Sequence, residues 1–114
     1  MRNQLLVLTT HLDSGAGASG STIRSAQVAG LLSNWASQPQ TVLLGDMNAG
    51  FGSREMQGIL DAGLLDTWGE AGRSARAGGD WIFHTPGLMV SEALRIDSPA
   101  SDHAAVVATF VSRP

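Results

Sequence analysis

The 114-residue sequence contains no cysteine and no lysine, and each absence excludes a class of protein. Without cysteine the chain has no disulfide scaffold, no thiolate zinc site and no cysteine nucleophile. All seven basic residues are arginine, the formal net charge is −3, and the largest basic group is the pair Arg73 and Arg76. Tight sequence-independent binding to duplex nucleic acid normally needs a basic face, so this composition argues against that role.

Long apolar runs are missing as well. No apolar stretch approaches the ~18 residues that a membrane-spanning helix needs, and the first residues lack the pattern of a signal peptide. With 43% hydrophobic and 15% charged residues, the sequence is typical of one folded domain or part of one. The chain is expected to begin inside a larger fold, so the compartment stays open: cytoplasmic as written, secreted if a segment precedes it.

Apolar patterning predicts strands and helices along the chain. The predicted strands are 4–10, 41–44, 81–84, 88–97 and 104–111, and the predicted helices are 23–36 and 54–62. In the first helix Val28, Leu31, Leu32 and Trp35 form an apolar stripe, and Ser53 is the candidate N-cap of the second helix.

Glycine-rich segments at 13–21 and 69–79 are predicted to be loops, with Ser21 or Thr22 capping the first helix. The order strand, helix, strand, helix and three further strands predicts an α/β (α+β) layered unit with a mixed sheet. No repeat or linker divides the chain.

Asp46 and Asn48 follow the apolar run that ends in Gly45. Side chains two residues apart point to one side of an extended strand, so the carboxylate and the carboxamide are predicted to lie together. Such a pair suits a hard cation, or a phosphate with its attacking water. A strand-to-loop turn explains the same residues equally well, and both interpretations stay open.

Other polar residues also lie where predicted strands begin or end. His11 follows the first strand, Asp80 precedes the third, and Asp102 and His103 precede the last. Each alone has a structural explanation as a strand-end histidine, a cap, an ion-pair partner or a turn residue. Together they are predicted to share one rim of the sheet, where binding and catalytic sites are usually built.

Four short motifs resemble, in order, the second half of the endonuclease/exonuclease/phosphatase (DNase I-like) superfamily. They are Thr10-His11-Leu12, Leu44-Gly45-Asp46-Met47-Asn48, Asp80-Trp81-Ile82-Phe83 and Ser101-Asp102-His103. Arg24 and Gln27 also resemble the Arg-x-x-Gln common in that family. The resemblance implies half of a four-layer α/β/β/α sandwich, a mixed sheet with two helices on one face. Residues 1–114 would form the C-terminal half of the domain.

The resemblance also implies a divalent-metal-dependent phosphoesterase that hydrolyses a phosphodiester or phosphomonoester with activated water. His11 would contact the scissile phosphate, and Asn48 would hydrogen-bond the phosphate or the water. Asp46 would orient or deprotonate the water, or help to hold a metal ion. Carboxylate and amide oxygens suit Mg²⁺ or Mn²⁺ rather than zinc.

At the last two motifs the resemblance implies three roles. Asp80 would orient His103, which would act as general base or phosphate ligand, and Asp102 would join Asp46 as a metal ligand. The chain departs from the family in following His103 with Ala104 and Ala105, where the family has Arg or a small residue and then proline.

A larger departure is the absence of the family's first-half motifs, an Asn and a metal-binding Glu. The isolated chain is therefore expected to be an incomplete enzyme, and the alternative is a non-catalytic phosphate-binding, metal-binding or interaction module of the same descent. The inner sheet face is expected to need cover from a homodimer partner or a missing N-terminal half. The substrate class stays open between nucleic acid, phospholipid headgroup and small phosphoester.

Overall fold

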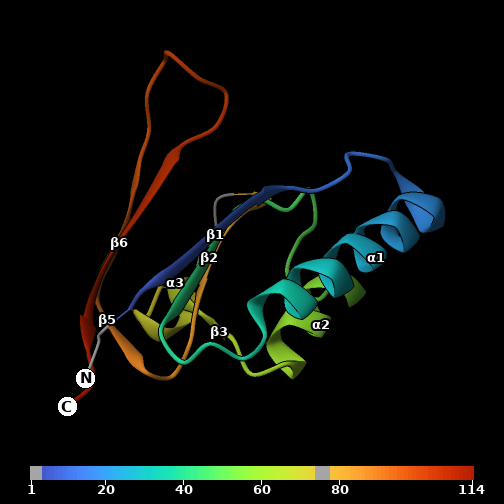
Figure 1. The fold of residues 1–114 in the computed structure, drawn as a ribbon. Coiled ribbons are helices and arrows are strands. Elements are labelled where there is room, and N and C mark those ends of the chain that lie inside the picture. Colours follow the sequence, from blue (N-terminus) through green and yellow to red (C-terminus); the bar gives the residue numbers. More distant parts are fainter. Residues whose placement is uncertain (1–3, 74–77) are drawn as a thin grey trace.

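The order of helices and strands follows the predicted alternation, with two additions. The structure is a computed structural model that describes residues 4–73 and 78–114. Its elements (Figure 1) are β1 (Leu6–His11), α1 (Gly17–Trp35), β2 (Thr41–Asp46), α2 (Arg54–Asp61), β3 (Leu65–Asp66), α3 (Thr67–Glu70), β4 (Asp80–His84), β5 (Leu88–Ile96) and β6 (Ala105–Ser112).

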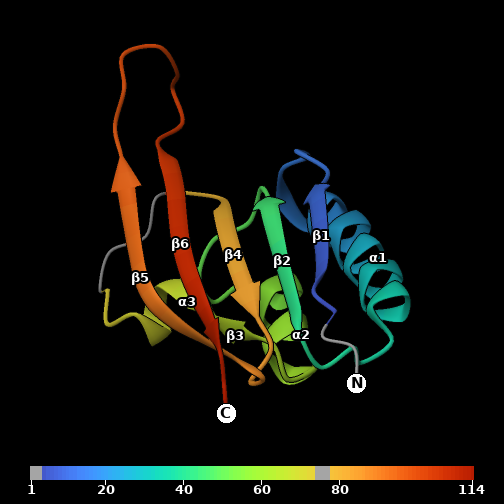
Figure 2. The ribbon, with the colours of Figure 1, turned by 60° about the vertical axis from the view of Figure 1, so that its left-hand side comes forward.

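Four strands form a mixed sheet in the order β1-β2-β4-β3, and β5 and β6 form a separate antiparallel pair. The crossover through α1 makes β1 and β2 parallel, whereas β4 runs antiparallel to β2. The short β3 pairs with only the last two residues of β4, and Figure 2 shows β6 beside β4. The predicted mixed sheet and α/β (α+β) class are confirmed.

The core lies between the mixed sheet and the two longer helices, which pack side by side on one face (Figures 1 and 2). Strand periodicity explains this, because Leu6 and Leu8 of β1 pack against the core while Val7 between them is 52% exposed. On α1 the predicted stripe provides the buried Val28 and Trp35. The fully buried centre consists of Leu43, Met47, Met56, Ile59, Leu64, Trp81 and Phe83.

The beginning of α1 is where the prediction is wrong. The helix begins at Gly17 rather than at residue 23, and its N-cap, Ala16, makes no side-chain hydrogen bond. Small residues are needed there because a Cβ on Gly20 would lie 1.9 Å from the carbonyl oxygen of Gly15. The many glycines and serines suggest a loop. They are present because the residues before α1 pack closely against its first turns, where Gly20 meets Gly15.

The elements β3 and α3 were not predicted, because both are too short to show a hydrophobic period. Asp66 begins α3 by accepting a hydrogen bond from the Trp68 amide at 3.2 Å. The predicted loop at 69–79 therefore starts inside a helix, and part of it, including Arg76, lies outside the described residues. No helix in the described part of the chain is both long and apolar enough to cross a bilayer.

Candidate functional site

Strand pairing places three of the predicted site residues side by side. His11 of β1 is in register with Asp46 of β2, and Asp46 is in register with Asp80 of β4. The parallel strands β1 and β2 end at this edge and the antiparallel β4 begins there, so all three side chains share one side of the sheet. We call His11, Asp46 and Asp80 the polar row.

At one end of the polar row, His11 is open to solvent. Its Nε2 lies 3.5 Å from Asp46 Oδ2, and the His11 side chain is 73% exposed while that of Asp46 is 20% exposed. The imidazole is therefore accessible to a ligand that approaches the carboxylate.

At the other end, His103 joins the polar row from the turn before β6. Its Nδ1 donates a hydrogen bond of 2.7 Å to Asp80 Oδ2. This hydrogen bond and the negative charge of Asp80, with a smaller contribution from Asp102, raise the pKa of His103 above its ordinary value. The carboxylate thus fixes one ring nitrogen as the donor and leaves Nε2 facing away from it.

The centre of this arrangement fits a divalent cation. One potential ligand atom from each of Asp46, Asp80 and His103 lies within 4.8 Å of the others. Two carboxylates suit Mg²⁺ or Mn²⁺, and an imidazole nitrogen is a better ligand for Mn²⁺ than for Mg²⁺. Asp102, predicted as a metal ligand, is exposed and is not a member of this group among the described residues.

Asn48 lies beside the polar row in a strained turn. Its φ is +48°, and its amide donates to Asp46 Oδ1 at 3.0 Å, so the turn interpretation holds. Its side-chain Nδ2 donates to the Leu12 carbonyl oxygen at 2.7 Å. The carboxamide therefore ties the segment after β1 to the segment after β2, next to the candidate site.

Two glycines allow the backbone to approach this site closely. Gly45 has a φ of +149°, and a Cβ there would lie 1.8 Å from the Thr10 carbonyl oxygen. A Cβ on Gly79 would lie 3.2 Å from both the Asn48 nitrogen and Asp46 Oδ1. The spacing between β1 and β2 depends on Gly45 having no side chain, and the path of the chain into β4 depends on the same property of Gly79.

Sequence reasoning missed the role of Glu55. It was assigned to the first turn of a helix, and it is there, but the structure also buries it against α1. Arg24 Nε donates to Glu55 Oε2 at 2.7 Å. Burial raises the pKa of Glu55, but hydrogen bonds from its own backbone amide, Arg24 and Ser21 outweigh it and lower that pKa below its usual value. The Arg-x-x-Gln pattern formed by Arg24 and Gln27 was the signal in the sequence that this part of α1 makes specific polar contacts.

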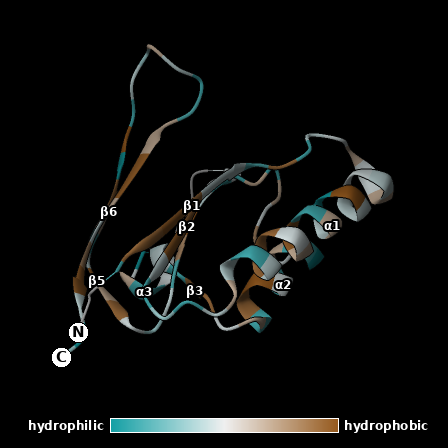
Figure 3. Ribbon diagram, in the orientation of Figure 1, coloured by the Kyte–Doolittle hydropathy of each residue, from teal (hydrophilic) through white to brown (hydrophobic). Residues whose placement is uncertain are grey.

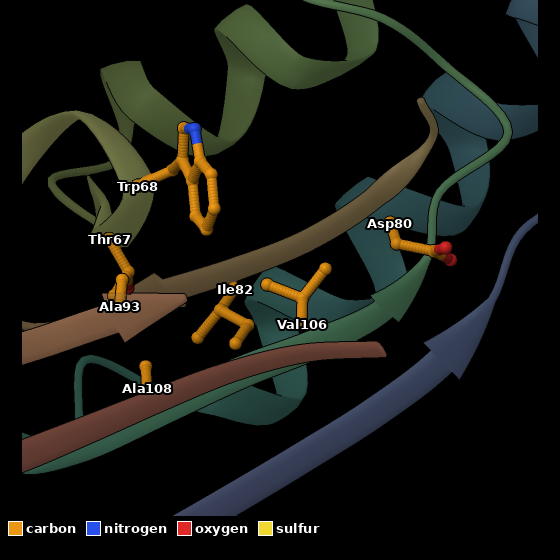
Figure 4. A pocket seen from close by; sticks show the side chains of 7 residues that line it. All are labelled: Thr67, Trp68, Asp80, Ile82, Ala93, Val106 and Ala108. Carbon is orange, nitrogen blue, oxygen red and sulfur yellow. The ribbon is translucent and has the colours of Figure 1, made fainter. Parts of the chain in front are cut away.

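The site is an open rim and not a deep pocket. A small cavity of about 10 Å³ lies between α3, β4, β5 and β6, and Figure 4 shows the carboxylate of Asp80 pointing away from the other residues that line this cavity. This volume suits at most one water molecule. The guanidinium of Arg73 lies 5.6 Å from the Trp68 ring centre, and its Nε donates to the Ala93 carbonyl at 2.8 Å.

Fold and rim together define a class of protein, an α/β chain with carboxylates and histidines gathered at one sheet edge. No protein-family model and no curated protein matches the sequence. Solved structures do match. A functionally unknown conserved protein from Enterococcus faecalis V583 has a TM-score of 0.77 and 20% identity, covering 98% of this chain and 52% of that one.

Of two further structures, one is named for a family and the other for a protein. An endonuclease/exonuclease/phosphatase from Beutenbergia cavernae DSM 12333 has a TM-score of 0.71 and 24% identity over 93% of this chain and 36% of that one. D. rerio TDP2 complexed with single-strand DNA product has a TM-score of 0.71 and 20% identity, covering 95% of this chain and 56% of that one. The chain has the endonuclease/exonuclease/phosphatase fold, as the motifs predicted, and spans about half the length of most of these structures.

Proposed function

We propose that this chain carries the greater part of the site of a divalent-metal-dependent phosphoesterase, as the C-terminal half of such a domain. The observation that supports this most strongly is that His11, Asp46, Asp80 and His103 come from four separate segments and meet at one rim. A group whose pKa is shifted by a specific charge partner at an accessible edge is a functional-site candidate, and His103 beside Asp80 is such a group.

In the proposed reaction His103 is the general base. Asp80 holds Nδ1 as a donor, so Nε2 is the atom that accepts a proton from the attacking water. The raised pKa makes the imidazole a stronger base. A divalent cation, held by Asp46 with Asp80 or Asp102 as second carboxylate, would neutralise phosphate charge and acidify water.

His11 is proposed to bind the phosphate that is attacked, and Asn48 is proposed to bind the attacking water. The imidazole of His11, accessible beside Asp46, would donate a hydrogen bond to a phosphate oxygen. The Nδ2 of Asn48 donates one of its two N–H groups to Leu12, which leaves the second N–H as a donor and Oδ1 as an acceptor. That oxygen matches a water molecule better than a phosphate, because phosphate oxygens are acceptors themselves.

A second half of the fold is proposed to complete the site and cover the exposed apolar surface. Val7, Met89, Val107 and Val111 on the strands are between 39% and 52% exposed, and Figure 3 shows hydrophobic colour along these strands. Leaving apolar area in water is unfavourable by about 25 cal/mol per Å². An N-terminal half or a second copy of the chain would remove this cost, and the missing Glu ligand would come with the former.

Hydrolysis of bis-p-nitrophenyl phosphate with Mg²⁺ or Mn²⁺ tests the function. We expect weak turnover, because the second half of the site is missing, which Asp46→Ala and His103→Ala each abolish and which Asp61→Ala, at an exposed position of α2, leaves unchanged. Turnover that survives both site substitutions would contradict the proposal. Because one similar structure is a complex with single-strand DNA product, an oligonucleotide is the first natural substrate to try.

The alternative function is a binding module that retains the rim without turnover. The group of Asp46, Asp80 and His103, whose potential ligand atoms lie within 4.8 Å of one another, supports such binding. Manganese binding seen by isothermal titration and abolished by Asp46→Ala, in a chain that hydrolyses no phosphoester, would support this alternative over the enzyme.

A further inference from the structure

A buried ion pair joins α1 to α2, and the proposed reaction does not use it. Arg24 and Glu55 have side chains only 9% and 2% exposed, and Ser21 Oγ donates to the second carboxylate oxygen at 3.0 Å. Taking two charges out of water is costly, and apolar residues of similar size often hold two helices together as well. Packing of α1 against α2 therefore does not by itself account for the pair.

The free end of the Arg24 guanidinium holds the segment that follows His11. Its Nη1 donates to the carbonyl oxygens of Asp13, at 3.0 Å, and Gly15, at 2.6 Å. One turn further along α1, Gln27 Oε1 accepts a hydrogen bond from the Asp13 amide at 2.9 Å. The helix thus binds the segment through donors and an acceptor that match its backbone.

The same segment fixes Asn48. Leu12, which is 2% exposed, accepts the Asn48 side-chain hydrogen bond at its carbonyl and donates from its amide to the Asp46 carbonyl at 2.9 Å. An unbroken series of contacts runs from Glu55 through Arg24 to the segment at 12–15 and on to Asn48. His11 stands at the head of that segment.

We propose that Arg24, Gln27 and Glu55 are positioning residues of the candidate phosphoesterase site. They hold the segment at 12–15 so that the Leu12 carbonyl keeps the Asn48 amide in one orientation and His11 stays opposite Asp46. This inference rests on the proposed function for its kinetic consequence, but the positioning itself can be measured without any activity.

The first experiment uses nuclear magnetic resonance on the full chain. Gln27→Leu removes one hydrogen bond to the segment, and Gln57→Leu is the matched control because the Gln57 side chain donates to Asp61 within α2, at 2.8 Å. We expect the side-chain amide signal of Asn48 to move in Gln27→Leu and to stay in place in Gln57→Leu. An Asn48 signal unchanged in Gln27→Leu overturns the proposal.

The second experiment is kinetic and uses Arg24→Lys. Lysine keeps the positive charge beside Glu55 but lacks the planar fork that reaches Asp13 and Gly15. With bis-p-nitrophenyl phosphate, kcat is expected to fall on the order of tenfold while KM changes by less than about twofold. An unchanged kcat overturns the kinetic consequence. A wild-type chain without turnover contradicts the proposed function instead, and the Asn48 signal then decides the positioning alone.

Discussion

Gly45 is a position where any side chain should damage the fold, and the size of the effect follows from the geometry. A Cβ at this residue of β2 would lie 1.8 Å from the Thr10 carbonyl oxygen and 2.8 Å from its carbonyl carbon. Both atoms belong to the backbone of β1, so they cannot rotate away as a side chain would. The φ of +149° adds a second penalty, because residues other than glycine rarely adopt this backbone conformation.

The two penalties set the expected magnitude of Gly45→Ala. Forcing an extra methyl into a packed site costs about 1–3 kcal/mol, and an unfavourable backbone conformation costs about 1–3 kcal/mol more. We expect the free energy of unfolding to fall by about 3 kcal/mol or more. The matched control is Gly30→Ala on α1, where a Cβ meets nothing within 4 Å. There the same substitution should stabilise the helix by about 0.5–1 kcal/mol.

Urea unfolding followed by tryptophan fluorescence measures both variants. With a slope of about 1–3 kcal/mol per molar urea, a loss of about 3 kcal/mol moves the midpoint down by about 1–3 M. A Gly45→Ala variant within about 0.5 kcal/mol of the wild type would refute the close approach of β1 and β2 next to Asp46.

Three other substitutions have expected outcomes. Glu55→Gln should destabilise the fold by about 3–5 kcal/mol at neutral pH, because it leaves a buried guanidinium without its counter-ion. Since folding lowers the pKa of Glu55 from its ordinary 4.5, its stabilisation is complete above that value and is lost as the pH falls through the folded pKa. The gap between variant and wild type should therefore close in acid unfolding curves. Thr67→Val removes the 2.7 Å hydrogen bond to the buried His84 Nδ1 and should lower the thermal unfolding free energy by about 1–3 kcal/mol. Ser53→Ala removes the cap that accepts from the Met56 amide and should cost about 1 kcal/mol in urea unfolding.

Local patterns in the sequence were sufficient to predict most of the fold. The stripe through Val28 and Trp35 predicted the buried face of α1, and Ser53 predicted the beginning of α2. The early start of α1 could not be predicted, because only the packing of Gly20 onto Gly15 explains why a run of small residues is helical.

The candidate site divides in the same way. Polar residues at strand ends predicted that His11, Asp46 and Asp80 would meet, since parallel and antiparallel pairing bring those ends together. The burial of Glu55 could not be predicted from its own surroundings. It depends on Arg24, which is 31 residues away in the sequence and reaches Glu55 only after α1 and α2 have packed.

The polar row also determines when, during folding, the chain can first bind a metal ion or a phosphate. Its members are brought into register by the pairing of β1 with β2 across a helix and of β2 with β4 across the intervening residues. Both pairings close long loops. Such contacts form later than local ones because the chain loses the entropy of the loop before the contact stabilises it. The β5–β6 hairpin can form early and still contain none of the row. An affinity for metal or phosphate that uses the row will therefore emerge late, after the crossover has closed, and will stabilise only chains that are already nearly native.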